Sequence, residues 1–232
     1  MAAAPQLRGN RLALAGAVLY FLEWVVIVIA PSLPTDKLGK DPASIAAAYA
    51  HQPARTALLA GWLSVVLLGR ILFIVAVRDA LREVPRAHVL LDWAVAAMAV
   101  SVVIEIVDYA LVASGAWLAH AGASAATIVA LDTAGTILFL MIFGPVGVSA
   151  LAASIAMRQS RLFPAWLCWL GVAGGALLAL GGIIAASAQG SSGGFHDVGG
   201  VLGAIPVAIV WIWLVATGVV VWRAAPNARG AA

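Results

Sequence analysis

Six long stretches of the sequence consist almost entirely of apolar residues, and no other feature constrains the fold as strongly. These stretches lie at about 12–30, 57–77, 89–116, 126–156, 163–187 and 199–222. Each is long enough to cross roughly 30 Å of hydrocarbon as a helix that rises about 1.5 Å per residue. Because the stretches are continuously apolar and do not alternate, they predict membrane helices and not an outer-membrane barrel.

The composition supports this prediction. Apolar residues make up 64% of the chain and charged residues 10%, whereas a soluble domain has roughly 45–50% and about 25%. The net charge of +3 is small and its basic residues lie at the predicted helix ends, which argues against nucleic acid as a partner. We expect residues 1–232 to form a single all-α membrane domain, a bundle of six transmembrane helices. No small-residue cleavage site follows the first apolar stretch, so we expect that stretch to be retained.

The basic residues between the stretches predict the orientation. One side would receive nine arginines, namely Arg8, Arg11, Arg78, Arg82, Arg86, Arg158, Arg161, Arg223 and Arg229. The other side would receive only Lys37, Lys40 and Arg55. Because cytoplasmic loops are enriched in arginine and lysine, both termini are predicted to lie in the cytoplasm, with the chain in a bacterial cytoplasmic membrane. On the outer side, Asp41 and Pro42 form a helix-start signal that predicts a short surface helix over Pro42–Ala50.

Several ionisable side chains are predicted inside the membrane helices, where each charge costs about 2.5 kcal/mol or more. The acidic ones are Glu23, Glu105, Asp108, Asp132 and, at the start of the last helix, Asp197. Arg70 is the one basic residue within the membrane that could neutralise them, and in a reading without chemistry it is simply the counter-ion of Glu23. Glu105 and Asp108 share a helix face, which Ser101 and Tyr109 extend. Carboxyls crowded into a low dielectric cannot all be ionised, so at least one is expected to hold a proton and act as a general acid.

Nine tryptophans form the second unusual feature. Five lie near predicted helix ends, as in an interfacial belt. The other four are predicted near mid-depth or in the outer half: Trp24, Trp62, Trp211 and Trp213. An indole face stabilises a positive charge by about 0.5–2 kcal/mol. Together with Tyr20 and Tyr109, these rings would suit a site that creates and shelters a cation.

Motifs for metals and phosphates are missing from the sequence. The four histidines are scattered without HExxH spacing, and Cys168 is the single cysteine, which excludes an internal disulfide and a cysteine metal cage. Neither a P-loop nor an aspartate-rich DDxxD pattern occurs. We therefore expect neither a metal nor another cofactor.

Two resemblances follow from these residues. The segments RLALAGAVLY at 11–20, VRDALR at 77–82 and LFPAWLCWLG at 162–171 resemble a widespread family of bacterial six-helix membrane proteins whose function is not known. In size, lack of metal motifs and buried acids, the chain also resembles the small integral-membrane terpene cyclases of meroterpenoid and indole-sesquiterpenoid pathways. That second resemblance implies protonation of an alkene or epoxide in a lipophilic prenylated substrate that enters from the bilayer.

The cyclase resemblance assigns roles to particular residues. It implies Glu23, Glu105 or Asp108 as the catalytic acid, and it implies a set of substrate-binding residues: Tyr20, Trp24, Trp62, Arg70, Tyr109, Asp132, Trp211 and Trp213. Two alternatives stay open. Intramembrane carboxyls beside an arginine also suit a proton-coupled carrier or a protein that binds a lipophilic ligand. They can also act as hydrogen-bonding groups between helices, with no chemistry at all. The oligomeric state does not follow from the sequence.

Overall fold

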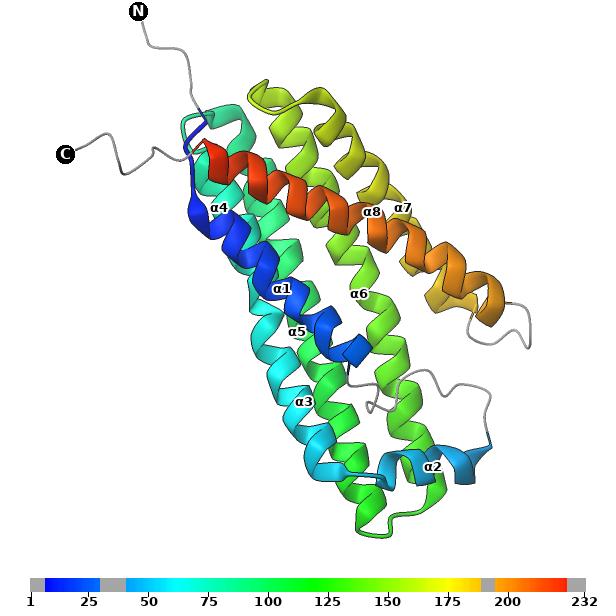
Figure 1. The fold of residues 1–232 in the computed structure, drawn as a ribbon. Coiled ribbons are helices and arrows are strands. Elements are labelled where there is room, and N and C mark those ends of the chain that lie inside the picture. The colour runs from blue at the N-terminus through cyan, green and yellow to red at the C-terminus, as the bar shows by residue number, and fades with distance from the viewer. Residues whose placement is uncertain (1–6, 30–40, 189–194, 225–232) are drawn as a thin grey trace, which may run out of the picture.

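The computed structural model of the protein describes residues 7–29, 41–188 and 195–224, and the helix side chains within 7–23, 41–184 and 205–224. Every regular element in these ranges is a helix (Figure 1), which confirms the all-α prediction. The elements are α1 Arg11–Ile29, α2 Pro42–Ala50, α3 Pro53–Val66, α4 Leu68–Ala80, the 3₁₀ turn η1 Pro85–Ala87, α5 His88–His120, α6 Ala125–Ser160, α7 Ala165–Ala188 and α8 Phe195–Arg223.

Five helical segments within the described side chains are long and apolar enough to cross a membrane. They are Pro53–Ala80, Pro85–His120, Ala125–Ser160, Ala165–Ile184 and Ile205–Arg223. These segments indicate a membrane protein. The first predicted stretch, 12–30, coincides with α1, but its side chains beyond Glu23 lie outside the described residues.

The second apolar stretch is predicted as one continuous helix, whereas the structure divides it into two helices, α3 and α4. A tightened turn at Leu67 separates α3 from α4, because the Arg70 amide donates to the Leu67 carbonyl three residues earlier, at 3.0 Å. The two helices also extend beyond 57–77 at both ends. Pro53 occupies the first turn of α3, where a missing N–H is tolerated and φ is already helical.

One end of the bundle, which we call the basic end, gathers the start of α1, the end of α8 and the α4–α5 and α6–α7 connections (Figure 1). The Arg8 amide donates to the Ala80 carbonyl at 3.1 Å, and the Asn10 amide donates to the Val221 carbonyl at 3.3 Å. Surface ion pairs form at this end. They join Arg78 to Asp92, Arg82 to Asp79 at 3.5 Å and Arg8 to Glu83 at 3.8 Å.

The opposite end, which we call the α2 end, is crossed by the short surface helix α2. Its bounds, Pro42–Ala50, are those predicted, and the Asp41 carboxylate caps it by accepting from the Ser44 amide at 3.1 Å. This helix packs on α5 and α6 and buries Ile45 and Tyr49. Those two residues are four apart and so share one helix face.

Glycines let the long helices touch through their backbones. A Cβ on Gly16 of α1 would lie 2.6 Å from the Gly69 carbonyl oxygen of α4, and a Cβ on Gly69 would lie equally close to the Gly16 oxygen. Gly147 of α6 and Gly175 of α7 meet in the same manner. Such small-residue contacts are typical of helix packing in membranes. The first pair fixes α1 directly against α4, and this contact positions the buried polar groups.

Candidate functional site

One face of α5 carries a row of buried polar side chains. Ser101, Glu105, Asp108 and Tyr109 are all buried, and their spacing of three and four residues places them on the same side of the helix. The predicted shared face is therefore confirmed. Helix α5 packs against α3, α4 and α6 on its various sides, so this face looks into the protein.

Arg70 of α4 and Glu105 of α5 form a buried ion pair. Glu23, the counter-ion that the sequence offers as an alternative, does not make this direct contact. The reason lies in the rotational setting of α4, which aims the guanidinium at α5. Glu23 is still within electrostatic reach of Arg70, while the Arg70 Nε atom is buried with no hydrogen-bond partner. A buried ion pair is favourable only when its remaining N–H groups also have acceptors. Because Arg70 Nε has none, the guanidinium keeps a donor that a second carboxylate can use.

Glu23 of α1 is held by Tyr109 of α5. The Tyr109 hydroxyl donates to Glu23 Oε1 at 3.0 Å, and this bond joins residues that are 86 positions apart. The second carboxyl oxygen, Oε2, is buried and has no hydrogen-bond partner. A buried carboxyl oxygen without a donor is costly when charged. Glu23 is therefore a place where a proton can be held.

Tyr20 of α1 connects this region to α8. Its ring stacks on Trp211 with the ring centroids 4.3 Å apart and the planes at 22°. The Arg70 guanidinium carbon lies 4.8 Å from the Tyr20 ring centroid, a cation–π distance. The structure thus brings together Tyr20, Arg70 and Trp211, all predicted as site residues. The cation beside Tyr20 is a side chain of the protein itself.

Asp108 and Asp132 form a separate acidic group. Asp108 lies one helix turn beyond Glu105, toward the α2 end. Asp108 projects from α5 onto Gly135 of α6, where an added Cβ would lie 2.8 Å from Asp108 Oδ1. Asp132 lies one turn before Gly135 on the same helix and is close enough to Asp108 for their charges to interact. Two nearby carboxylates in a low dielectric repel each other, so the two groups are more stable when one of them is protonated.

Tyr49 of α2 completes this group and was missed from the sequence. Its hydroxyl donates to Asp132 Oδ1 at 2.9 Å. Its ring fills the space over Gly115, where a Cβ would lie 2.8 Å from Tyr49 Cε1. Burial, and then the Asp132 carboxylate, raise the pKa of Tyr49 above the ordinary tyrosine value, so the hydroxyl remains a donor. The sequence signal that could have identified Tyr49 is its spacing of four from Ile45, which places both residues on the one face that this surface helix buries.

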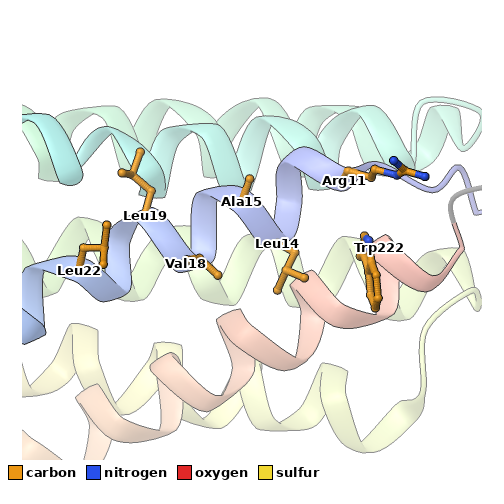
Figure 2. A pocket seen from close by; sticks show the side chains of 7 residues that line it. All are labelled: Arg11, Leu14, Ala15, Val18, Leu19, Leu22 and Trp222. Carbon is orange, nitrogen blue, oxygen red and sulfur yellow. The ribbon is translucent and has the colours of Figure 1, made fainter.

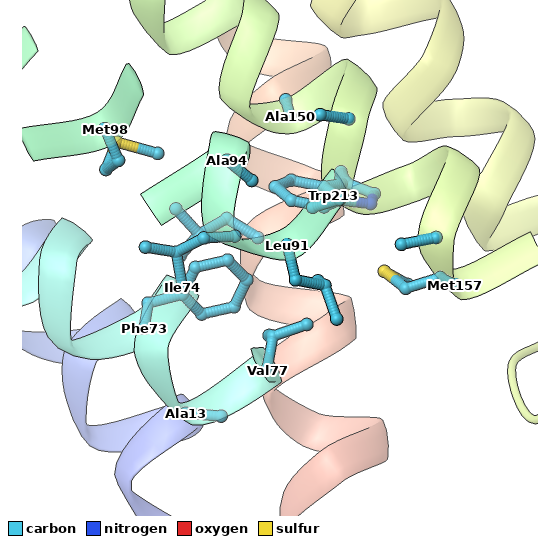
Figure 3. Packing of buried hydrophobic residues seen from close by; sticks show 14 of the residues in the cluster. Ala13, Phe73, Ile74, Val77, Leu91, Ala94, Met98, Ala150, Met157 and Trp213 are labelled. Carbon is cyan, nitrogen blue, oxygen red and sulfur yellow. The ribbon is translucent and has the colours of Figure 1, made fainter. Parts of the chain in front are cut away.

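Two predicted tryptophans do not join the site. Trp62 of α3 is 45% exposed on the outside of the bundle. Trp213 is fully buried, but it packs edge-on against Phe73 with the ring centroids 5.6 Å apart, inside the apolar core (Figure 3). The side chain of Trp24 lies outside the described residues, as does that of Asp197. Tyr20 and Trp211 are thus the aromatic pair beside the buried ion pair.

The charges of the site are unbalanced. Among the described side chains, Arg70 is the one buried basic group, and Glu105 takes its direct contact. Glu23 and Asp108 therefore have no basic group in ion-pair contact within the described part of the chain. These residues also contain no group of three histidine, cysteine or acidic side chains arranged to hold a metal ion. Protons are the simplest charges that such carboxyls can take up.

The buried acidic, basic and tyrosine side chains among the described residues occupy one half of the bundle. They extend from Tyr49 at the α2 end, through Asp132, Asp108 and Tyr109, to the Arg70–Glu105 pair. Between that pair and the basic end, the interior is a mainly apolar core that includes Phe73, Ile74, Leu91, Met98 and Trp213 (Figure 3). The buried polar side chains described there, among them Ser149, Ser154 and Thr217, carry no charge. The row of buried acidic, basic and tyrosine side chains therefore ends at the Arg70–Glu105 pair.

Comparisons of the chain with protein-family models, with curated proteins and with solved structures found no match.

Proposed function

We propose that the chain crosses the membrane six times, with α1 as the first span, α3 and α4 together as the second, and both termini in the cytoplasm. The basic end is then the cytoplasmic end, and α2 lies at the outer surface. The arginines of the α4–α5 and α6–α7 connections support this orientation, because basic residues are retained in the cytoplasm.

We infer that the protein is a proton-coupled carrier whose buried carboxyls take up protons from the outer side. The observation that carries this proposal is the row of ionisable groups from Tyr49 to Glu23 and Glu105, beyond which the described buried side chains are uncharged. A channel needs a polar path through the whole membrane, whereas a carrier needs access from one side at a time. Intramembrane carboxyls that face the protein interior are typical of proton relays.

The contacts suggest how protonation would be coupled to movement. A proton that arrives at the Asp132–Asp108 pair can pass inward to Glu23, whose Oε2 has no donor. Neutral Glu23 no longer attracts Arg70, so the guanidinium is held by Glu105 alone. Because Glu23 is on α1 while Arg70 and Glu105 are on α4 and α5, the loss of this attraction changes how strongly α1 is held to the other two helices.

The test is a charge-movement measurement that requires no knowledge of the cargo. Purified protein is reconstituted on a solid-supported membrane, and the pH on one side is stepped. We expect a transient proton-binding current, which Glu23→Gln and Asp108→Asn each reduce at least tenfold. Asp92→Asn is the matched control, since Asp92 is an exposed acid paired with Arg78 on the surface, and it should retain the current. A wild-type current no larger than that of empty membranes would reject the proposal.

A terpene cyclase remains the second candidate, and the unpartnered Glu23 Oε2 favours it. A protonated carboxyl with a free oxygen can donate to an alkene held against it. The assay uses membranes with a farnesylated substrate and compares wild type with Glu23→Gln and Glu105→Gln. Cyclised product that is lost in Glu23→Gln supports the cyclase, and unchanged cyclisation in both variants rejects Glu23 and Glu105 as its acids. A proton-binding current without any product supports the carrier.

A further inference from the structure

A shallow groove with a volume of about 490 Å³ follows the outside of α1 (Figure 2). Five apolar residues of α1, between Leu14 and Leu22, form most of its lining. Arg11 and Trp222 stand together where the groove reaches the basic end (Figure 2). The groove is separate from the buried carboxyls, since none of them lines it.

The groove has the length of one lipid leaflet. From Arg11 to Leu22, α1 rises roughly 16 Å at about 1.5 Å per residue. The hydrocarbon core of a bilayer is about 30 Å thick, so one leaflet contributes about half of that. An acyl chain that lies along the groove would therefore reach from the basic end to the middle of the membrane.

The end of the groove near Arg11 is suited to an anionic headgroup. Arg11 is exposed and has no carboxylate partner among the described residues, whereas its neighbours Arg8, Arg78 and Arg82 are all in ion pairs. Guanidinium groups bind phosphate through paired hydrogen bonds. Trp222 is 45% exposed beside it, and tryptophan prefers the headgroup level of a bilayer.

We propose that this groove is a binding site for one anionic phospholipid of the leaflet at the basic end. Its acyl chain lies along Leu14, Val18 and Leu22, and its phosphate is bound by Arg11 next to the Trp222 indole. Any phospholipid can cover an apolar face, but only an unpaired cation at the headgroup level selects an anionic one. The site is independent of the proposed proton chemistry.

The test measures lipid retention by native mass spectrometry. Purified protein is titrated with phosphatidylglycerol and, separately, with phosphatidylcholine of the same acyl chains. Wild type should retain one phosphatidylglycerol at a concentration at least tenfold lower than that needed for phosphatidylcholine. Arg11→Gln should abolish this preference. Arg86→Gln, which removes an exposed arginine at the same end but outside the groove, should keep it.

A second pair of variants tests the apolar part of the site. Ala15→Phe fills the groove, and it should weaken retention of phosphatidylglycerol at least fivefold. Ala96→Phe, at an exposed position of α5, should not. Equal retention of the two lipids by wild type, or equal behaviour of Arg11→Gln and Arg86→Gln, would overturn the proposal. Displacement of the lipid by millimolar inorganic phosphate would overturn the role given to the acyl chain.

Discussion

Arg70 contacts more of the buried polar site than any other single residue. It pairs with Glu105, lies over the Tyr20 ring and attracts Glu23. Removing one partner of a buried ion pair leaves the other charge uncompensated, so Arg70→Gln should lower the free energy of unfolding by about 3–5 kcal/mol. The double variant Arg70→Gln with Glu105→Gln should recover most of this loss. Unfolding in mixed micelles at increasing SDS measures both. A double variant as unstable as the single one would show that Arg70 acts through something other than Glu105.

Tyr109 is the hydrogen-bond donor that holds Glu23. Tyr109→Phe keeps the ring but leaves the Glu23 carboxyl without its donor, which should cost about 1–3 kcal/mol in the same unfolding measurement. Adding Glu23→Gln should make the effect of Tyr109→Phe smaller, because the two groups act as a pair. Ser114→Ala is the control, since it removes an exposed hydroxyl that bonds only to its own helix. Additive effects of the two substitutions would argue against the pairing.

At the scale of elements, the contact between α1 and α4 depends on two glycines. Within a helix, alanine is more favourable than glycine by about 1 kcal/mol. Gly61→Ala, at a position where an added Cβ meets nothing within 4 Å, should therefore stabilise the protein slightly. Gly16→Ala should instead destabilise it, because its Cβ would lie 2.6 Å from backbone atoms of α4. Thermal unfolding of the two variants side by side measures the difference, and equal shifts would mean that α1 can move away from α4 at no cost.

The docking of α2 through Tyr49 should appear in the pH dependence of stability. The folded state raises the pKa of Tyr49, whereas in the unfolded chain it is about 10. The contribution of Tyr49 is therefore complete below about pH 10 and declines as the pH rises further, because only the unfolded chain gains from ionisation. Wild type should lose more stability between about pH 10 and 11 than Tyr49→Phe does.

The absorbance of tyrosinate provides an independent readout of the same residue. In the folded protein at about pH 11, wild type and Tyr49→Phe should absorb equally, because Tyr49 remains a phenol there. After denaturation, wild type should show one additional tyrosinate. An additional tyrosinate already present in folded wild type would mean that α2 does not bury the hydroxyl.

For the whole molecule, the proposed orientation can be tested with single cysteines. In a Cys168→Ala background, which removes the one natural thiol, we introduce either Arg86→Cys or Ala121→Cys. Both positions are exposed and lie at opposite ends of α5. In intact cells, an impermeant maleimide should label the cysteine at 121 and leave the cysteine at 86 unmodified until the membrane is broken. The reverse pattern would invert the proposed topology.

The long helices and α2 could be predicted from sequence because their signals are local. Runs of apolar residues mark the membrane segments, and the Asp41–Pro42 signal marks the start of α2. Burial is different in a membrane protein, because an apolar side chain is stable both in the core and against lipid. Trp62 and Trp213 are chemically alike, yet one is exposed and the other is fully buried.

Which side chains meet across two helices could not be predicted, for a related reason. The residues that meet depend on how each helix is rotated about its axis, and a stretch that is apolar on all sides gives no signal of this rotation. Arg70 meets Glu105 rather than Glu23 for that reason. The burial of Glu23, Glu105, Asp108 and Asp132 could be predicted, since a charge in a membrane helix usually faces the protein interior.

The bond between Tyr109 and Glu23 also has a consequence for biosynthesis. The two residues are 86 positions apart, and ribosomes add about 5–20 residues per second. Glu23 is therefore added to the chain roughly 4–17 s before its donor. During that interval the first helix carries an acid that nothing in the nascent chain yet satisfies. In the proposed topology the first span therefore gains its full stability only after α5 has been made, so a chain truncated before Tyr109 should hold that span in the membrane less firmly than the full chain does.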